Sequence, residues 1–205
     1  MAPVWGRSAC AFPVAAVGFK HLEPGNPEKR APSGMQDTPL VAVPCMNINT
    51  IPIAKMDGTM TNLDAYASQV VLLVNVASRC GLTPQYAQLE QLQRTYGNRG
   101  FTVLGFPSNQ FLQELSSNEA IAEFCSSTYG VTFPVFDRIR VNGKHEHPLY
   151  TELKKTKDAS GKAARITWNF EKFLLMPSGE VRRFRPQTVP DDPEIIRAIE
   201  ANLPG

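Results

Sequence analysis

The sequence predicts an α/β domain in which a mixed central β-sheet is flanked by helices and preceded by a β-hairpin. Two features indicate this fold class. Short apolar runs alternate with stretches of helical spacing from Met46 to the end of the chain, an order typical of mixed sheets covered by helices. One of these runs, residues 70–76 (VVLLVNV), is almost uninterrupted and rich in β-branched side chains, as expected of a strand buried on both faces.

The remaining elements are predicted from turn, cap and periodicity signals. Asp57-Gly58 is a hairpin turn signal, and Pro84 and Ser117 stand at expected helix starts. The expected elements in chain order are a hairpin over residues 51–61, strand 70–76, helix 84–96, strand 101–106, helix 117–128, strand 135–141, helix 148–153, strands 172–176 and 180–184, and helix 192–202. This order is that of the thioredoxin-like fold.

The first 45 residues differ from the rest of the chain. Prolines and glycines recur through them without a sustained period, which predicts a flexible extension over residues 1–45 and a domain over residues 46–205. An apolar stretch at residues 9–19 is interrupted by Pro13 and has no clear cleavage signal, although an organelle transit peptide stays open because no acid precedes Glu23.

Composition excludes several classes of function. Hydrophobic residues make up 42% of the chain and charged residues 20%, as in ordinary soluble domains. The formal net charge of +2 is too small to indicate nucleic acid or a membrane surface as a partner. No apolar run approaches the roughly 20 residues of a membrane span. With no convincing targeting signal, we expect a cytoplasmic location.

The four cysteines indicate neither a disulfide scaffold nor a metal centre. Cys10, Cys45, Cys80 and Cys125 are few and far apart, unlike the dense cysteines of small secreted proteins. No pair has metal-ligand spacing, so the sequence predicts no metal and no other cofactor. We interpret Cys10 and Cys45 as ordinary small apolar residues.

Cys80 is the candidate for chemistry because of its place in the chain. It lies four residues after strand 70–76 and just before the helix that starts near Pro84, where open α/β sheets bind ligands. A helix N-terminus and the neighbouring Arg79 both favour a thiolate. The second cysteine of a Cys-x-x-Cys motif is replaced by Thr83, which disfavours a disulfide carrier.

Three separated motifs make the chain resemble the glutathione peroxidase family. They are the segments 75–81 (NVASRCG), 106–111 (FPSNQF) and 168–170 (WNF), found in the order that the family has. The similarity extends from about Met46 to Leu203, nearly the whole patterned part of the chain. It implies a thioredoxin-like fold and a peroxidase activity on hydrogen peroxide and organic hydroperoxides.

The resemblance also implies roles for individual residues. Cys80 stands where the family has its peroxidatic selenocysteine or cysteine, and Gln113, Trp168 and Asn169 match the other members of its catalytic tetrad. Indole and amide N–H groups can donate hydrogen bonds to a thiolate and to peroxide oxygens. Gln110 is the alternative to Gln113, although such a residue usually supports the loop in this family. Asn75 is expected to hold backbone near the site.

Two routes can regenerate Cys80 after it is oxidised. Cys125 lies in a helix where many non-selenium members keep a resolving cysteine, and a Cys80–Cys125 disulfide would be reduced by thioredoxin. Alternatively, Cys125 is a buried structural residue and glutathione acts directly. Leu82 and Thr167 stand where selenium members have lysines, and the tetramer-forming loop is absent between Phe124 and Phe133, which favours a monomeric, thioredoxin-using enzyme.

Two other classes of function stay open at this point. A peroxide sensor would use the same cysteine but pass its oxidation to a partner protein. A cysteine hydrolase would need a histidine base beside the thiol; the candidates are His145 and His147, which lie in a connecting segment before Pro148.

Overall fold

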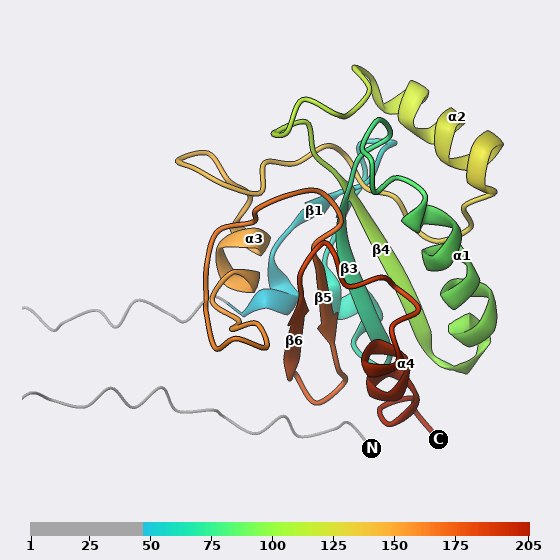
Figure 1. Cartoon of the computed structure of the whole chain (residues 1–205), viewed down its shortest axis with the longest axis vertical. Helices are drawn as coiled ribbons and strands as arrows, with labels where there is room; N and C mark the ends of the chain where they lie inside the picture. Colours follow the sequence, from blue (N-terminus) through green and yellow to red (C-terminus); the bar gives the residue numbers. More distant parts are fainter. Residues whose placement is uncertain (1–46) are drawn as a thin grey trace, which may run out of the picture. The chain divides into compact units, whose positions relative to one another are not determined.

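A four-stranded sheet lies at the centre of the computed structural model, which describes residues 47–205 (Figure 1). Its strands are β3 (Val70–Val76), β4 (Phe101–Pro107), β5 (Lys172–Leu175) and β6 (Val181–Phe184), in the spatial order β4-β3-β5-β6. The β3–β4 pair is parallel, and the other two pairs are antiparallel. The sheet is therefore mixed, as predicted. The expected extension over residues 1–45 lies outside the described residues.

Strand β3 occupies the interior of the sheet because its side chains are apolar on both faces. All seven of its residues are buried. Val70, Leu72 and Val74 belong to one hydrophobic core, whereas Val71 and Leu73 belong to a second one. This alternation follows from the two-residue period of a strand, and it explains why the run is almost continuously aliphatic.

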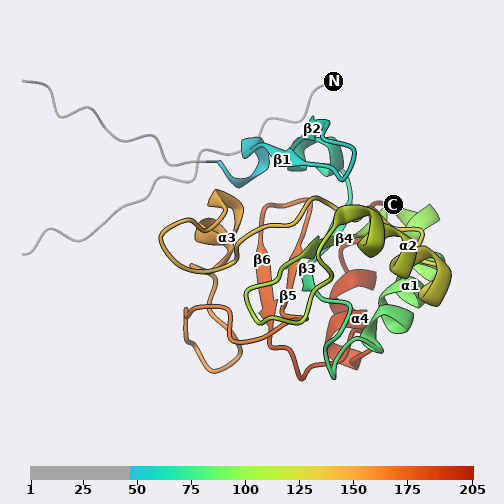
Figure 2. The ribbon, with the colours of Figure 1, turned by 90° about the horizontal axis from the view of Figure 1, so that it is seen from above.

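Helices cover both faces of the sheet, and Figure 2 shows α3 on the opposite side from α1 and α4. Helices α1 (Gln85–Tyr96), α2 (Asn118–Tyr129) and α4 (Pro193–Glu200) contribute to the first core, and α3 (Pro148–Leu153) contributes to the second. The predicted cap at Ser117 is confirmed, since its hydroxyl accepts a hydrogen bond from the amide of Ala120 at 3.2 Å.

The predicted hairpin is present but short. Strands β1 (Ile53–Ala54) and β2 (Met60–Thr61) pair antiparallel. Gly58 has a φ of 82° in the connecting turn, a conformation that glycine adopts without steric cost. The Asp57 carboxylate accepts hydrogen bonds from both the amide and the hydroxyl of Thr59, which stabilises the turn.

The strand predicted over residues 135–141 is wrong. Only two isolated bridges form there, a parallel one between Val135 and Gly105 and an antiparallel one between Phe136 and Lys55. The amides that follow pair with different partners, Asp137 with the carbonyl of Ala54 and residue 139 with that of residue 107. Because the hydrogen bonds of the segment alternate between β4 and the region of β1, neither strand offers it a continuous ladder.

The described part of the chain, residues 47–205, contains no helix with both the length and the apolar character needed to cross a membrane.

Lys172 is a buried lysine within the sheet. Its side chain is fully buried in β5, and its ammonium group donates hydrogen bonds to the carbonyls of Phe170 at 2.6 Å and Pro186 at 3.4 Å. Burial lowers the pKa of this lysine to about 7, although the neighbouring Glu171 opposes the effect. Burial penalises the charged form, whereas the unfolded chain keeps the ordinary lysine pKa.

This difference in pKa predicts that stability rises with pH above neutrality. Between pH 7 and about 10 the unfolded chain binds a proton at Lys172 that the folded chain has lost, so raising the pH disfavours unfolding. We expect the free energy of unfolding in urea to gain about 1 kcal/mol per pH unit from pH 7 to 8.5 through this group. Lys172→Met should lose this gain, and Lys155→Met, at an exposed lysine, should keep it. An unchanged slope in Lys172→Met would contradict the assignment.

Candidate active site

Cys80 lies in the turn that joins the carboxyl end of β3 to α1. Only 6% of the residue is exposed. The amide of Leu82 donates a hydrogen bond to the Cys80 sulfur at 3.3 Å. This backbone donor holds the sulfur at a defined place in the turn.

The hydroxyl of Thr83 closes this turn from within. It accepts a hydrogen bond from the amide of Cys80 at 2.9 Å and donates one to the carbonyl of Ala77, also at 2.9 Å. The position that holds the second cysteine in a Cys-x-x-Cys protein thus carries a buried hydroxyl that fixes the backbone on both sides of Cys80.

Gln113 and Asn169 meet beside the Cys80 turn, although 56 residues separate them in sequence. The Asn169 amide donates a hydrogen bond to Oε1 of Gln113 at 3.0 Å. The carbonyl of Gln113 accepts a hydrogen bond from the amide of Arg79 at 2.8 Å, which ties Gln113 to the residue next to Cys80. Oδ1 of Asn169 is buried and has no partner among the described residues.

Trp168 is partly open to solvent, with 39% of the residue exposed. Its ring packs against Phe111, with the ring centroids 5.2 Å apart. Its carbonyl accepts a hydrogen bond from the side-chain amide of Asn75 at 3.0 Å. The expectation that Asn75 holds backbone near the site is thus confirmed.

Two residues next to this group have strained backbone conformations. Leu112 has a φ of 58° and Phe170 a φ of 65°, values in the left-handed region that side chains other than glycine rarely adopt. Leu112 precedes Gln113, and Phe170 follows Asn169. Such strain costs about 1 kcal/mol or more at each position and concentrates at functional sites.

Gln110, the alternative to Gln113, is engaged elsewhere. Its Oε1 accepts hydrogen bonds from the amides of Val141 and Asn142, and its Nε2 donates to the carbonyl of Asn142. Both ends of the side-chain amide are therefore used to anchor a loop. Gln113 is the glutamine that the fold brings to the Cys80 turn.

Glu114 is a site residue that we did not predict from the sequence. Its Oε1 accepts hydrogen bonds from the amides of Ser78 at 3.1 Å and Leu115 at 2.8 Å. The carboxyl group therefore holds the backbone two residues before Cys80. Burial raises the pKa of this carboxyl, against the opposing effect of its hydrogen bonds. Sequence periodicity does not indicate a buried carboxyl group at this position. The one sequence feature that could have identified Glu114 is that it directly follows Gln113.

Cys125 is buried in α2, with 3% of the residue exposed. It belongs to the same hydrophobic core as Cys80, and both thiols are free. Burial raises the pKa of the Cys125 thiol to about 11, and the nearby Glu114 carboxylate adds to the effect, while contact with the Tyr86 hydroxyl opposes it. Cys125 is therefore a neutral, unreactive thiol as long as α2 is folded.

Neither of the two candidate histidines for a cysteine hydrolase is shown next to Cys80: His145 is exposed in the segment before α3, and His147 serves another purpose. Nδ1 of His147 accepts a hydrogen bond from the amide of Leu149 at 3.2 Å and caps α3. That helix packs into the core on the other face of the sheet from α1.

The chain is similar to known peroxidases in sequence. A family model described as glutathione peroxidase matches residues 48–154. The Escherichia coli protein named thioredoxin/glutathione peroxidase BtuE is 46% identical over 178 residues, which cover 77% of this chain and 97% of that protein.

Solved structures extend the similarity to the fold. The chain superimposes on the crystal structure of GPX1 from T. cruzi with a TM-score of 0.61 and 32% identity, over 77% of this chain and 96% of the other. A thioredoxin-family thiol:disulfide interchange protein from Chlorobium tepidum superimposes with a TM-score of 0.53 at 18% identity, over 73% and 92% of the two chains. The predicted thioredoxin-like fold is thereby confirmed.

The role of Thr83 in closing the Cys80 turn can be tested by substitution. Thr83→Val keeps the shape of the side chain but leaves the amide of Cys80 and the carbonyl of Ala77 without a partner. We expect it to lower the free energy of unfolding in urea by about 1–3 kcal/mol. Thr83→Ser keeps the hydroxyl and should lose less than half as much. Equal losses in the two variants would show that the methyl group, rather than the hydrogen bonds, matters.

Proposed function

We propose that this chain, which belongs to the glutathione peroxidase family, reduces hydroperoxides through the thiol of Cys80. Its family makes the chain a thiol peroxidase, an oxidoreductase; the proposal concerns the residues and the reductant. The observation that carries it is that three polar groups lie at the Cys80 turn: the Leu82 amide and the side chains of Gln113 and Asn169. The Leu82 amide faces the Cys80 sulfur, and the paired amides of Gln113 and Asn169 are tied to the same turn.

The proposed chemical step is a nucleophilic displacement on the peroxide. The Cys80 thiolate attacks one oxygen of R–O–O–H, the O–O bond breaks, and the sulfur becomes a sulfenic acid. The other oxygen leaves as an alkoxide or hydroxide and takes up a proton, giving an alcohol or water. Donors from Gln113, Asn169 and the Trp168 indole would stabilise the negative charge as it moves from sulfur to oxygen.

The surroundings of the site support organic hydroperoxides as substrates alongside hydrogen peroxide. Leu112 is 87% exposed and Trp168 39% exposed, and these two large apolar side chains adjoin Gln113 and Asn169 in sequence. Exposed apolar surface of this kind can cover the carbon chain of a substrate. No part of the proposed step requires a charged group on the substrate.

For regeneration we propose that Cys125 resolves the sulfenic acid. Its thiol would displace the hydroxyl of Cys80, releasing water and forming a disulfide that thioredoxin then reduces. The name of the 46% identical relative, thioredoxin/glutathione peroxidase, supports thioredoxin as the reductant. Only Ile121 and Cys125 are fully buried in α2, so unwinding this helix to release the cysteine would expose few fully buried side chains. It would also separate the rings of Phe124 and Tyr129 from that of Tyr86.

We also propose that the enzyme is a monomer that works in the cytoplasm. Helix α2 ends at Tyr129 and is capped by Gly130, and the chain re-enters the core at Phe133. This short connection leaves no room for the longer loop that the family's tetramers use, which supports the monomer.

Replacing Cys80 tests the proposed function directly. Cys80→Ser should lower peroxide-dependent consumption of NADPH by at least about a hundredfold, because a hydroxyl is a far poorer nucleophile. The assay is run with thioredoxin and its reductase and, in parallel, with glutathione and its reductase. Cys10→Ser and Cys45→Ser are the matched controls and should keep their activity. Turnover of Cys80→Ser at the wild-type rate would refute the proposal.

Replacing Cys125 tests the route of regeneration. In the Cys10→Ser/Cys45→Ser background, Cys125→Ser should lower thioredoxin-supported turnover by at least about tenfold, since thioredoxin needs the internal disulfide. The first oxidation of Cys80, measured in a single turnover, should be unchanged. Thioredoxin-supported turnover at the wild-type rate would instead make Cys125 a structural residue.

A further inference from the structure

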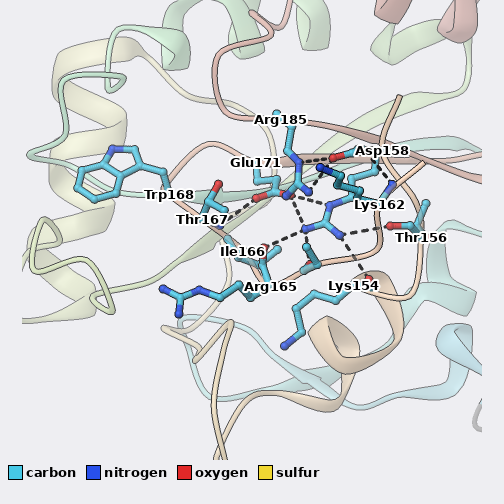
Figure 3. Close-up of polar contacts among 12 residues, drawn as sticks. Lys154, Thr156, Asp158, Lys162, Arg165, Ile166, Thr167, Trp168, Glu171 and Arg185 are labelled. Carbon is cyan, nitrogen blue, oxygen red and sulfur yellow. Dashed lines mark hydrogen bonds and ion pairs between the residues drawn. The ribbon is translucent and has the colours of Figure 1, made fainter. Parts of the chain in front are cut away.

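Glu171 is a fully buried carboxylate three residues after Trp168 in the chain. Its Oε1 accepts hydrogen bonds from the guanidinium groups of Arg183 at 2.6 Å and Arg185 at 2.8 Å. Its Oε2 accepts one from the backbone amide of Thr167 at 3.3 Å. Figure 3 shows Glu171 at the centre of these contacts, with the ring of Trp168 turned away from them. The carboxylate therefore links two cations of the β6 region to the residue that precedes Trp168.

The backbone around Glu171 is also held by hydrogen bonds. Its amide donates to Oδ1 of Asn75 at 3.0 Å, and the side-chain amide of Asn75 donates to the carbonyl of Trp168. The amide of Phe170 donates to the carbonyl of Asn75 at 2.6 Å. The five residues 167–171 are thus held at both ends, and Trp168 and Asn169 lie between the two attachments.

The two arginines that pair with Glu171 also hold the loop of residues 154–165, which precedes it in the chain. The Arg183 guanidinium is fully buried and donates hydrogen bonds to the carbonyls of Lys154, Thr156, Ala164 and Arg165. Arg185 also pairs with Asp158 at 2.7 Å. Glu171 is the carboxylate that neutralises Arg183 in this arrangement. Without its charge, a buried guanidinium would remain uncompensated.

Such a network contributes geometry more than stability. Burying ions costs about as much as their attraction returns, so an apolar cluster of the same size would stabilise the fold equally well. What ions and hydrogen bonds add is direction, since each donor requires an acceptor at a fixed place. The residue between the attachments that most needs such support is Phe170, whose φ of 65° is strained.

We propose that Glu171 is a positioning residue of the peroxidase site, which with Arg183 and Arg185 sets where Trp168 and Asn169 lie relative to Cys80. It touches neither substrate nor sulfur. It acts by holding the segment 167–171 in one arrangement, so that the indole and the Asn169 amide are ready before peroxide arrives. The inference rests on the proposed function, because it concerns the residues that assist Cys80.

The test compares two substitutions of the same kind at two buried carboxylates. Glu171→Gln removes the charge while keeping the size of the side chain. Glu90→Gln is the matched control, because Glu90 is also buried, pairs with Arg94 at 2.7 Å and accepts a hydrogen bond from the amide of Thr132, but lies on α1. Both variants are placed in a Trp5→Phe background, where Trp168 is the remaining tryptophan.

The measurements are the rate constant for oxidation of Cys80 by peroxide in a single turnover, the quenching of Trp168 fluorescence by iodide, and urea unfolding. Glu171→Gln should slow the oxidation by at least about tenfold, since small misplacements in a site have effects of this size, and should increase quenching. Glu90→Gln should lose stability but keep the wild-type rate within about twofold. Glu171→Asp, which restores the charge on a shorter side chain, should recover part of the rate.

A folded Glu171→Gln variant with the wild-type rate and unchanged quenching would overturn the inference. If that variant does not fold, Arg185→Gln is the test in its place, since Arg185 is 26% exposed and its loss leaves the Arg183 pair intact. A slower oxidation of Cys80 with increased quenching of Trp168 would support the inference. An unchanged rate and unchanged quenching would overturn it. These outcomes are separate from the fate of the proposed function, which depends on Cys80→Ser. A dependence on Cys80 without a dependence on Glu171 or Arg185 would refute only the positioning role.

Discussion

The site depends on one set of hydrogen bonds, those between Asn75 at the end of β3 and the segment 168–171. Strand β3 is buried along its whole length and continues directly into the Cys80 turn. Asn75 extends the pairing of β3 with β5 by using both ends of its side chain. The same rigid strand therefore determines where Cys80 lies and where Trp168 and Asn169 lie, which fixes the two halves of the site relative to each other.

Holding polar groups in this way has an energetic cost that the rest of the fold must offset. Asn169 and Glu114 each keep a buried oxygen without a partner among the described residues, and Leu112 and Phe170 have strained backbones. Each feature costs about 1–3 kcal/mol, against a total stability of only about 5–15 kcal/mol for a typical domain. Burial of apolar side chains in the two cores on either side of β3 offsets this cost in free energy. The aliphatic residues of β3 contribute to both cores.

The elements that could be predicted from sequence are those with strong local signals. The run at residues 70–76 predicted a buried strand because only aliphatic side chains suit both faces of a covered sheet, and Ser117 predicted a helix start through its own cap. The segment 135–141 had similar composition but no continuous neighbour to pair with, which its residues alone do not reveal. Other features depend on residues that are far apart in sequence, namely the contact between Gln113 and Asn169 and the proposed role of Glu171. Local periodicity cannot predict such contacts.

The proposed cycle makes opposite demands on the two cysteines, and the fold separates them. Attack on peroxide benefits from a fixed environment, and Cys80 has one, since Thr83, Glu114 and the Leu82 amide all constrain its turn. Resolution requires Cys125 to leave its burial site, because its thiol, with a pKa of about 11, is a poor nucleophile inside the core. Helix α2 buries two side chains, whereas α1 buries six. Unwinding α2 would therefore expose fewer fully buried side chains than unwinding α1, which is consistent with a proposed cycle in which Cys125 moves and the Cys80 turn stays fixed.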